Sequence, residues 1–523
     1  MSPLDAINPA DIKSISVMKD ASATAIYGSR GANGVIIIET IKGNSSKGKG
    51  VISFNTYASL SGVSRVLPVL NGNEFIEYRR DVDPGGVLFF ANRDENEPKD
   101  PYALKQHDWQ DEILRTGFTN NYDISLRGSG DKTDYSLSLG ALNSEAVVRG
   151  NEQQRYSFRL NLDHRRSEKL LLGINTNASY SEYSGASHSG GGDELFNGIV
   201  QNLVISMPIE LYNPSFAVGD TYISPSSMLD DTYNNTETST FGLNAFMHYG
   251  MGDNFRLIVS GSGNVSNSKG SQFFGKNTSW GFGSNGKGSL DQRKAISING
   301  SAQLHYFKTI NEKHNIKAFV ATETNKYIYE WFGLTKTNFL EESTGVFDIS
   351  RGSILSSSGS YKDVTNRVSF FGRVNYSYND SHLLTLTYRA DGSDKFGEGN
   401  RFGFFPSAAY SWIILNNKFG KEESLVSFAK LRLSYGITGN DRISSHRYLA
   451  RLENTYYEGE LGFAPSSQAN PNLQWETTYQ SNIGFDFGFF KDAITGSIDF
   501  YKKETHDLLM PVPVPGRTGY SNQ

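Results

Sequence analysis

The sequence contains no cysteine among its 523 residues. This absence excludes disulfide bonds and thiolate metal sites, and it fits a chain that crosses an oxidising compartment. No run of about twenty apolar residues occurs either, so no segment is expected to cross a membrane as a helix. A membrane protein with this sequence would therefore have to be a β-barrel.

Neither charge nor reactive side chains indicate nucleic-acid binding or catalysis. The chain has 50 Lys and Arg against 55 Asp and Glu, with a formal net charge of -5, so it lacks the basic face that nucleic acid requires. Its nine His are scattered without an H-x-x-x-H pair, and no serine lies in a G-x-S-x-G elbow. We therefore predict no metal, no cofactor, no catalytic residue and no enzymatic activity, although acidic pairs such as Glu341 and Glu342 leave a glycosidase open.

Aromatic residues and glycine are abundant in an otherwise polar chain. Aromatic residues make up 13% of the sequence, with 28 Tyr and 33 Phe beside 53 Gly, whereas all hydrophobic residues together reach only 37%. Strands favour aromatic and β-branched side chains, and their turns favour Gly, Asn and Asp. The composition therefore predicts a mainly β fold.

Long runs of alternating apolar and polar residues follow residue 51. In segment 155–163 one face is apolar throughout, and the same alternation recurs at 135–139, 241–249, 296–306, 368–378 and 483–489. Such runs approach the ~9–11 residues that cross a bilayer at a tilt. Connections of unequal length, short at 379–381 and long at 184–193 and 269–293, favour a large antiparallel outer-membrane barrel. On periodicity alone, a soluble β-sandwich or propeller is the alternative.

A different pattern occupies residues 11–42. Alternation at 14–17 predicts a strand, Asp20 is placed to cap a short helix over 21–27, and Gly28 suits the left-handed conformation that ends a helix. The apolar run 35–38 predicts a second strand, and the Ser/Gly/Lys-rich stretch 44–50 predicts a linker. Because these glycines follow a helix and open a strand, the reverse of a phosphate-binding loop, we interpret them as tight-turn residues.

Four segments together carry a resemblance to a known family. Residues 11–40 include Tyr-Gly-Ser-Arg-Gly-Ala-Asn-Gly at 27–34, and the others are Arg-Ala-Asp-Gly-Ser-Asp-Lys-Phe-Gly at 389–397, Lys-Leu-Arg-Leu-Ser-Tyr-Gly-Ile-Thr-Gly-Asn at 430–440 and Asn-Pro-Asn-Leu-Gln-Trp-Glu at 470–476. In this order they resemble the SusC/RagA family of TonB-linked outer-membrane proteins. The resemblance implies a barrel of about 22 strands whose lumen is closed by a plug.

The resemblance also divides the chain. It assigns residues 1–43 to the C-terminal part of a small α/β plug domain, 44–50 to a linker and 51–523 to the outer-membrane β-barrel. Because no secretion signal opens the sequence and the family's last strands are not seen, we expect an internal fragment with an incomplete barrel. The plug signature comprises Asp20, Tyr27, Gly28, Arg30, Gly31, Asn33 and Gly34. Arg30 is expected either to tether the plug to the barrel wall through a carboxylate or to face water.

The function implied by the resemblance is TonB-dependent uptake of oligosaccharides or peptides across the outer membrane of a Gram-negative, Bacteroidetes-type bacterium. The implied partners are a SusD-like surface lipoprotein, TonB, outer-membrane lipid and the glycan or peptide substrate. Two alternatives stay open. A passive porin or surface β-barrel adhesin would have no need of a plug, and a secreted glycan-degrading β enzyme would be water-soluble.

Aromatic residues near the expected loops suggest where substrate could bind. Phe274 and Trp280 fall in the interval 269–293, and Trp331 lies beside another polar stretch. Their rings could stack on sugar faces while Asn and Asp bind hydroxyls, or they could pack against neighbouring loops and lipid. The substrate-binding residues are therefore unassigned, with these three as candidates.

Overall fold

The computed structural model describes residues 8–20, 24–43, 50–82, 100–185, 198–210, 223–416, 425–518 and 520. Strands dominate these residues, so the mainly β fold predicted from composition is confirmed. Of the expected linker 44–50, only Gly50 lies within the described residues.

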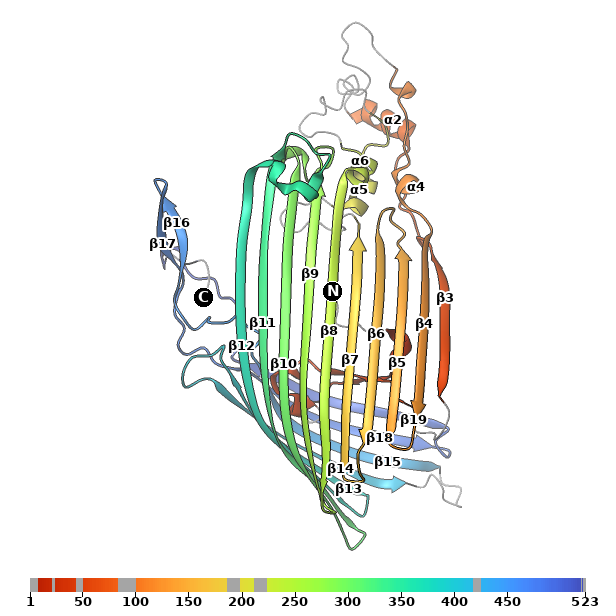
Figure 1. Cartoon of the computed structure of the whole chain (residues 1–523), viewed down its shortest axis with the longest axis vertical. Helices are drawn as coiled ribbons and strands as arrows, with labels where there is room; N and C mark the ends of the chain where they lie inside the picture. The colour runs from red at the N-terminus through yellow and green to blue at the C-terminus, as the bar shows by residue number, and fades with distance from the viewer. Residues whose placement is uncertain are drawn as a thin grey trace.

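One antiparallel sheet of fifteen strands makes up most of the described chain. Neighbours in sequence are neighbours in the sheet, except that β15 pairs with β18, and in the described residues β3 and β19 are the two unpaired edges. Figure 1 shows the sheet curling so that β13, β14, β15, β18 and β19 pass behind the front wall. The large antiparallel barrel sheet expected from the sequence is thus confirmed, but β3 and β19 do not pair with each other to close it. The strands are β3 (Val51–Ser61), β4 (Gly117–Ser129), β5 (Thr133–Glu145), β6 (Glu152–Arg165), β7 (Leu170–Ser184), β8 (Thr232–Met251), β9 (Phe255–Phe274), β10 (Lys287–Ile310), β11 (His314–Phe339), β12 (Gly352–Tyr378), β13 (His382–Ser393), β14 (Phe402–Asn416), β15 (Val426–Asn440), β18 (Glu476–Phe489) and β19 (Ile494–His506).

The two faces of this sheet differ in chemistry. Paired residues share a face, so the register can be followed from Leu139 through Phe158 and Ala178 to Phe241. That face is apolar and exposed, with Phe54, Ile124, Leu139, Phe158, Phe241, Val265, Ile298, Val320, Phe370, Leu386 and Phe404. The other face, which we call the inner face, carries buried polar side chains: Asn121, Asp123, Ser136, Ser138, Asn161, Asn325, Ser369, Thr387, Arg389 and Asp391. An apolar outside and a polar inside suit a barrel wall surrounded by lipid.

Connections at the two ends of the strands are unequal, as predicted. At one end they are short, at 252–254, 311–313 and 379–381, and at the other, which we call the outer end, they are long, at 62–116, 185–231 and 441–475. The interval 269–293 is not the long loop that its composition indicated. Because β9 continues to Phe274 and β10 begins at Lys287, only 275–286 connect them. The polar residues at 269–274 and 287–293 are paired in strands, and because a polar strand and a polar loop have similar compositions, composition misplaced this boundary.

Strands β8 to β12 are longer than a bilayer requires. β8 has 20 residues and β12 has 27, against the ~9–11 that span a membrane. Toward the outer end their outer face becomes charged, and Lys362 pairs there with Glu330 at 2.7 Å. These strands form the tallest part of the wall (Figure 1). Their outer parts therefore extend beyond the apolar band into water.

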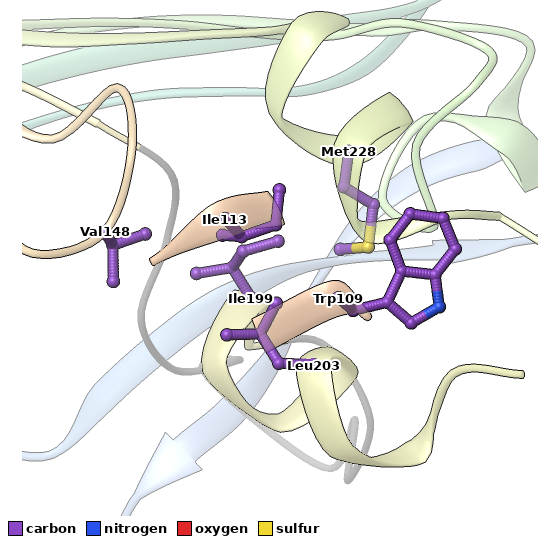
Figure 2. Close-up of a cluster of buried hydrophobic side chains, with 6 residues drawn as sticks. All are labelled: Trp109, Ile113, Val148, Ile199, Leu203 and Met228. Atoms are coloured by element: carbon purple, nitrogen blue, oxygen red, sulfur yellow. The ribbon is translucent and has the colours of Figure 1, made fainter. Parts of the chain in front are cut away.

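Short helices form a small hydrophobic core at the outer end. It contains Trp109, Ile113, Val148, Ile199, Leu203 and Met228 (Figure 2), contributed mainly by α4 (Trp109–Ile113), α5 (Ile199–Ile205) and α6 (Pro225–Asp230). Other elements are α2 (Gly72–Val82), η4 (Pro101–Ala103), η6 (Phe282–Ser284), η7 (Gly345–Arg351), η8 (Gly516–Thr518) and the hairpin of β16 (Arg451–Tyr457) with β17 (Glu460–Ser467). None of the described helices is both long and apolar enough to cross a bilayer.

Residues 8–43, described except for 21–23, form a separate unit that we call the N-terminal unit. It contains η2 (Pro9–Asp11), β1 (Ile12–Met18), η3 (Ala25–Arg30) and β2 (Val35–Thr40), and β1 pairs antiparallel with β2. The expected order of strand, short helix and strand is therefore present. In Figure 1 its red segments lie behind the front wall of the sheet.

Two local expectations for this unit can be compared with the structure. Gly28 interrupts η3 at the expected position with a positive φ of 56°, but its ψ of -135° lies outside the left-handed helical region, and η3 resumes after this kink and ends at Arg30. The cap expected from Asp20 stays a prediction, because residues 21–23 lie outside the described residues. The Asp20 carboxylate accepts hydrogen bonds from Ser434 at 2.8 Å and Asn482 at 3.2 Å in the large sheet, contacts that the local sequence could not show.

Candidate functional site

The N-terminal unit approaches the sheet most closely at Gly28. A Cβ atom added there would lie 2.0 Å from Asp391 Oδ2 and 2.3 Å from Arg389 Nε. No side chain fits at such distances, and the positive φ independently favours glycine. The backbone of η3 therefore lies directly against the two charged side chains of β13.

Arg389 and Asp391 hold this backbone from both sides of Gly28. Arg389 Nη1 donates to the carbonyl of Ile26 at 2.5 Å, and the amide of Ser29 donates to Asp391 Oδ2 at 3.2 Å. The two charged groups also pair with each other, Nε to Oδ1, at 2.6 Å, with side chains only 6% and 3% exposed. Buried charges are stable only when paired and hydrogen-bonded in this way.

The rest of the Arg389 guanidinium is also occupied. Nη2 donates to Ser369 Oγ at 2.9 Å and lies 3.6 Å from Glu323, and the ring of Phe371 lies 4.5 Å from the guanidinium carbon. These partners project from β12, which neighbours β13 in the sheet, and from β11 on the far side of β12. Residues of the sheet therefore position the guanidinium, and the Ile26 carbonyl of the N-terminal unit is one additional acceptor.

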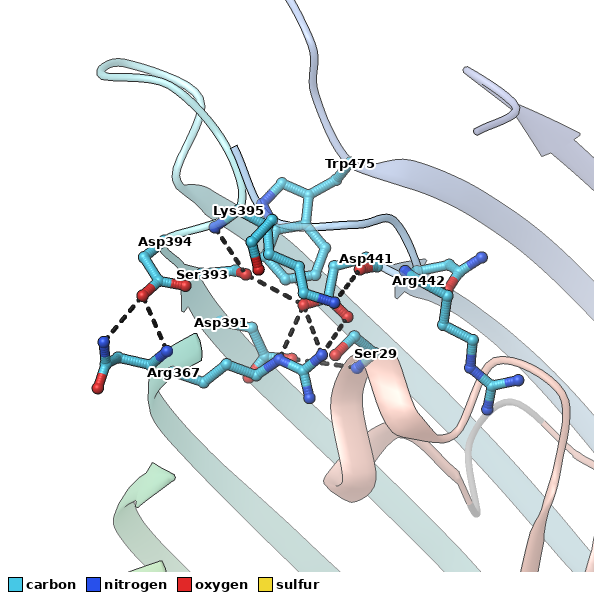
Figure 3. A network of polar contacts seen from close by, with 12 residues as sticks. Ser29, Arg367, Asp391, Ser393, Asp394, Lys395, Asp441, Arg442 and Trp475 are labelled. Atoms are coloured by element: carbon cyan, nitrogen blue, oxygen red, sulfur yellow. Dashed lines mark hydrogen bonds and ion pairs between the residues drawn. The ribbon is translucent and has the colours of Figure 1, made fainter. Parts of the chain in front are cut away.

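A second charged network lies next to this contact, toward the outer end. Arg367 makes a bidentate pair with Asp441, at 2.8 and 2.7 Å, and Ser393 donates to the same carboxylate at 3.1 Å (Figure 3). Lys395 donates to the Asp441 carbonyl at 3.2 Å. Burial lowers the pKa of the Lys395 ammonium, and Asp441 acts in the opposite direction. The network joins β12, β13 and the connection after β15.

Further contacts join the N-terminal unit to the inner face on other strands. Asn8 donates to Asp123, Arg159 pairs with Asp11 at 3.3 Å, Lys42 lies 3.7 Å from Asp163, and Lys503 donates to the Ala32 carbonyl at 3.4 Å. With the bonds from Asp20, these contacts reach β4, β6, β15, β18 and β19. The unit is therefore bound across the inside of the curved sheet by separate polar contacts.

Arg30 does not supply the tether that one expectation assigned to it. It lines a small cavity of about 80 Å³ together with Glu323, Arg367, Arg389 and other residues. Glu323 and Asp441 attract its guanidinium from a distance, but it forms no ion pair within 4 Å with a described residue. The tether is made instead by the main chain at Ile26 and Ser29. The nearby carboxylates are already engaged by other arginines.

The other signature residues mainly shape the backbone of the unit. Gly34 has φ 94°, and a Cβ there would lie 3.0 Å from the Met18 carbonyl. A Cβ at Gly31 would lie 2.7 Å from the Thr24 carbonyl. Tyr27 lines the same small cavity as Arg30, and Asn33 is exposed. The tight-turn interpretation of the glycines agrees with these positions.

The three candidate rings for substrate occupy different environments. Phe274 is the last residue of β9 and is buried, with its ring 5.0 Å from Trp280. Trp280 packs against the hydrophobic core of the outer end. These two rings are engaged in packing, the alternative that the sequence left open. Trp331 lies within β11 and not in a loop, on the same face as Asn325.

The residues that the sequence did not single out are those on the sheet side of the contact. Arg389 and Asp391 lie in segment 389–397, which carries the family resemblance, but the sequence assigned them no role. Arg367 directly precedes the alternating run 368–378, and Asp441 follows another resembling segment, 430–440. The common signal of Arg367, Arg389 and Asp391 is a charged residue at an inner-face position of a strand, where a lipid-facing residue could not be charged.

Comparison with known proteins identifies the family. The family model described as TonB dependent receptor-like, β-barrel, matches residues 201–523, more than half of the chain. The chain belongs to the TonB-dependent receptor family. As a TonB-dependent receptor β-barrel it is a protein of the outer membrane of Gram-negative bacteria, as expected.

Individual relatives of this TonB-dependent receptor confirm the SusC/RagA resemblance. TonB-dependent receptor SusC of Bacteroides thetaiotaomicron is 30% identical over 99% of this chain and 53% of its own length. A TonB-dependent receptor of Formosa agariphila is 31% identical, again over 99% of this chain and 53% of its own. The solved structure of the RagAB peptide transporter has a TM-score of 0.84 and 27% identity, covering 99% of this chain and 62% of that chain. The chain thus spans about half the length of the curated relatives it matches.

Proposed function

We propose that this TonB-dependent receptor takes up oligosaccharides or peptides across the outer membrane by energy-coupled movement of a plug. In this proposal residues 1–43 are the C-terminal part of the plug, 44–50 the linker and 51–523 the barrel wall. The observation that carries it is the contact of Gly28 and Ser29 with Arg389 and Asp391 inside the curved sheet. The solved RagAB peptide transporter supports the peptide class, and the oligosaccharide class comes from the SusC/RagA resemblance.

The proposed mechanism follows from how the two parts are held. Every strand of the wall between the edges β3 and β19 is hydrogen-bonded to two neighbours, so opening the wall would break many bonds at once. The N-terminal unit, in contrast, meets the wall through separate side-chain contacts that can break one after another. Force applied from the end with the short connections would therefore displace the plug and leave the wall intact.

The proposed partners occupy different surfaces. A SusD-like lipoprotein would cover the outer end, where the long connections and their helices lie. TonB would act from the opposite end, and lipid would surround the apolar band. The seven signature residues would keep the plug folded and seated while no force is applied.

Uptake by cells tests the function. A strain that lacks the gene should lose uptake of one class of labelled substrate, oligosaccharide or peptide, and a protonophore should abolish the same uptake in the parent strain. Uptake that persists with the protonophore would support a passive porin. Hydrolysis of the substrate by the purified protein, with no uptake phenotype in the deletion strain, would support the secreted enzyme.

A further inference from the structure

Two hairpins of the wall repeat one sequence pattern at the end with the short connections. Asn-Glu-Lys-His at 311–314 joins β10 to β11, and Asn-Asp-Ser-His at 379–382 joins β12 to β13. In both turns the asparagine and the acidic residue after it have positive φ, from 51° to 59°. The turns therefore place His314 and His382 at equivalent positions, each as the first residue of its strand.

The register places both histidines in one row on the outer face of the wall. The row crosses β11, β12, β13 and β14 through successive paired residues, which are His314, Tyr378, His382 and Trp412. Because side chains alternate along each strand, the row shares its face with the apolar residues Phe370 and Leu386. It is the last row before the short turns. It therefore lies where the apolar band meets the periplasmic surface of the bilayer.

A tyrosine on the neighbouring strand orients each imidazole. Nδ1 of His314 lies 2.7 Å from the Tyr376 hydroxyl, and Nδ1 of His382 lies 2.7 Å from the Tyr410 hydroxyl. When the hydroxyl donates to Nδ1, the proton of the neutral imidazole is on Nε2. Neither Nε2 atom forms a hydrogen bond with a described residue. Each ring is thus fixed through one nitrogen and keeps the other as a donor.

Charged groups of both signs flank the row. Lys308 is exposed on the outer face of β10 and pairs with Ile316, one row deeper than His314. At such a depth the flexible stem of a lysine carries its ammonium to the bilayer surface. Glu312 and Asp380, in the turns just before the histidines, are exposed and form no ion pair with a described residue. The row therefore offers donors for a phosphate beside carboxylates for an ammonium.

An apolar groove continues from the row toward the middle of the bilayer. It has a volume of about 830 Å³ and lies over β11 to β15. Two small residues on the outer face create the depression, because each lies between larger neighbours in its own row: Gly372 between Val320 and Tyr388, and Ala408 between Leu386 and Tyr435. The row of Tyr376 and Tyr410 separates this groove from the histidines. Hydrocarbon and not water surrounds the wall at this level.

We propose that each of the two repeats binds the phosphoethanolamine headgroup of a phospholipid in the periplasmic leaflet. The phosphate accepts hydrogen bonds from Nε2 of the histidine and from a neighbouring donor, which is Lys308 beside His314 and the Trp412 indole beside His382. The ammonium pairs with the carboxylate of the preceding turn. The two histidines are two strands apart, about 10 Å, so each can hold its own headgroup.

The groove and the charges together select this lipid. An acyl chain of the lipid at His382 fills the groove, which explains why small residues lie directly beyond the row. An anionic headgroup without an ammonium would leave Glu312 and Asp380 unpaired beside its phosphate. A girdle of tyrosine and tryptophan is usual at this level of a barrel, but such a girdle requires neither oriented histidines nor the repeated acidic turn. The site does not depend on which substrate is transported.

Native mass spectrometry of the detergent-solubilised full-length protein tests the proposal. The protein is titrated with phosphatidylethanolamine, phosphatidylglycerol or phosphatidylcholine of identical acyl chains, so that only the headgroup differs. Two molecules of phosphatidylethanolamine should bind about tenfold more tightly than either other lipid, the difference expected for one hydrogen bond to a charged group. His314→Phe and His382→Phe keep an aromatic ring without its donor. Each should remove one of the two tight sites, and the double variant should remove both.

Two further variants separate the headgroup from the chains. Asp380→Asn tolerates the positive φ of the turn and should equalise phosphatidylethanolamine and phosphatidylglycerol at one site. Ala408→Leu fills the groove and should weaken all three lipids equally at that site. Ala245→Leu, an exposed outer-face position of β8 outside the groove, should change neither.

His506→Phe is the matched control for the histidines, because His506 is exposed at the opposite end of the wall, as the last residue of β19. It should retain both tight sites. Heat-modifiable migration of every variant verifies that the barrel is folded. Equal binding of the three lipids by the unmodified protein would overturn the proposal. So would a double histidine variant that binds phosphatidylethanolamine within twofold of the unmodified protein, or a preference for phosphatidylglycerol, which would indicate a site for anions alone.

Discussion

At the scale of single residues, two charged side chains of β13 explain how the N-terminal unit is seated. Arg389 and Asp391 neutralise each other inside the sheet and each also binds the backbone of η3, at Ile26 and Ser29. Between these two bonds only glycine fits, at Gly28. A signature that looks local in the sequence therefore reflects a contact between residues 362 positions apart.

Gly28→Ala should loosen the N-terminal unit. The new Cβ would collide with Asp391 and would hold an alanine at positive φ, a strain of about 1–3 kcal/mol before the collision is counted. Limited trypsin digestion of the folded protein should cleave after Arg30 and Lys42 sooner than in the parent. Gly261→Ala, where a Cβ would meet nothing within 4 Å, is the control and should digest at the parental rate. Equal digestion of the Gly28 variant would contradict the seating described here.

Arg389→Met should destabilise the same contact by leaving Asp391 buried without its partner. Breaking a buried pair from one side costs about 3–5 kcal/mol. Hydrogen exchange of the amides of residues 24–31 should become faster, while that of β8 to β11 remains slow. Arg351→Met removes an arginine of an exposed pair with Asp348 and should change neither. If both variants exchanged alike, the Arg389 pair would not be what holds η3.

At the scale of elements, strand length and outer-face chemistry locate the bilayer on the wall. Outer-face positions of β12 are apolar at Val368, Phe370 and Val374, and become polar at Ser360 and Lys362 near the outer end. The strand continues unbroken past this change. Pairing between neighbours, and not lipid, thus decides where a strand ends.

Phe370→Lys and Ser360→Lys place the same charge on one face of one strand, inside and beyond the apolar band. A lysine in the lipid should cost about 2–4 kcal/mol near the midplane and almost nothing in water. Urea titration of folding into lipid vesicles should therefore show a lower midpoint for Phe370→Lys only. A similar loss for Ser360→Lys would place the bilayer boundary nearer the outer end than we infer.

At the scale of the whole molecule, a continuous hydrogen-bonded wall surrounds a unit attached through separate polar contacts. These contacts are distributed over strands on different parts of the curved sheet, at Asp11, Asp20, Ser29 and Lys42. Such an arrangement keeps the unit seated without fusing it to the wall. Movement of the unit relative to the wall is the proposed transport step.

Cross-linking the unit to the wall should stop that step. Because the chain has no cysteine, Asp20→Cys with Ser434→Cys introduces the sole pair, at positions whose side chains touch at 2.8 Å. Oxidation should abolish protonophore-sensitive uptake, and reduction should restore it. Each single cysteine variant, treated identically, should retain uptake. Full uptake by the oxidised double variant, with the cross-link verified by a mass shift, would show that this part of the unit does not move.

The sequence by itself determined the class of fold, the lipid-facing side chains and the family. Alternation with a period of two assigns faces, as at 155–163, and unequal connections distinguish the two ends, because both properties are local. The segment 269–293 was misread because a polar strand and a polar loop have similar compositions. The glycine-rich signature indicated tight turns, which the backbone at Gly34 bears out.

Only the tertiary structure decided which inner-face residues meet. Register across a sheet depends on every turn before it, so the sequence could not place Trp331 beside Tyr361 or Gly333 beside Gly359. Sheet curvature likewise brings Arg389 to Ile26, which local pattern cannot show. Arg30, the charge that the motif made conspicuous, has no ion-pair partner among the described residues, because the nearby carboxylates are already bound by arginines of the wall.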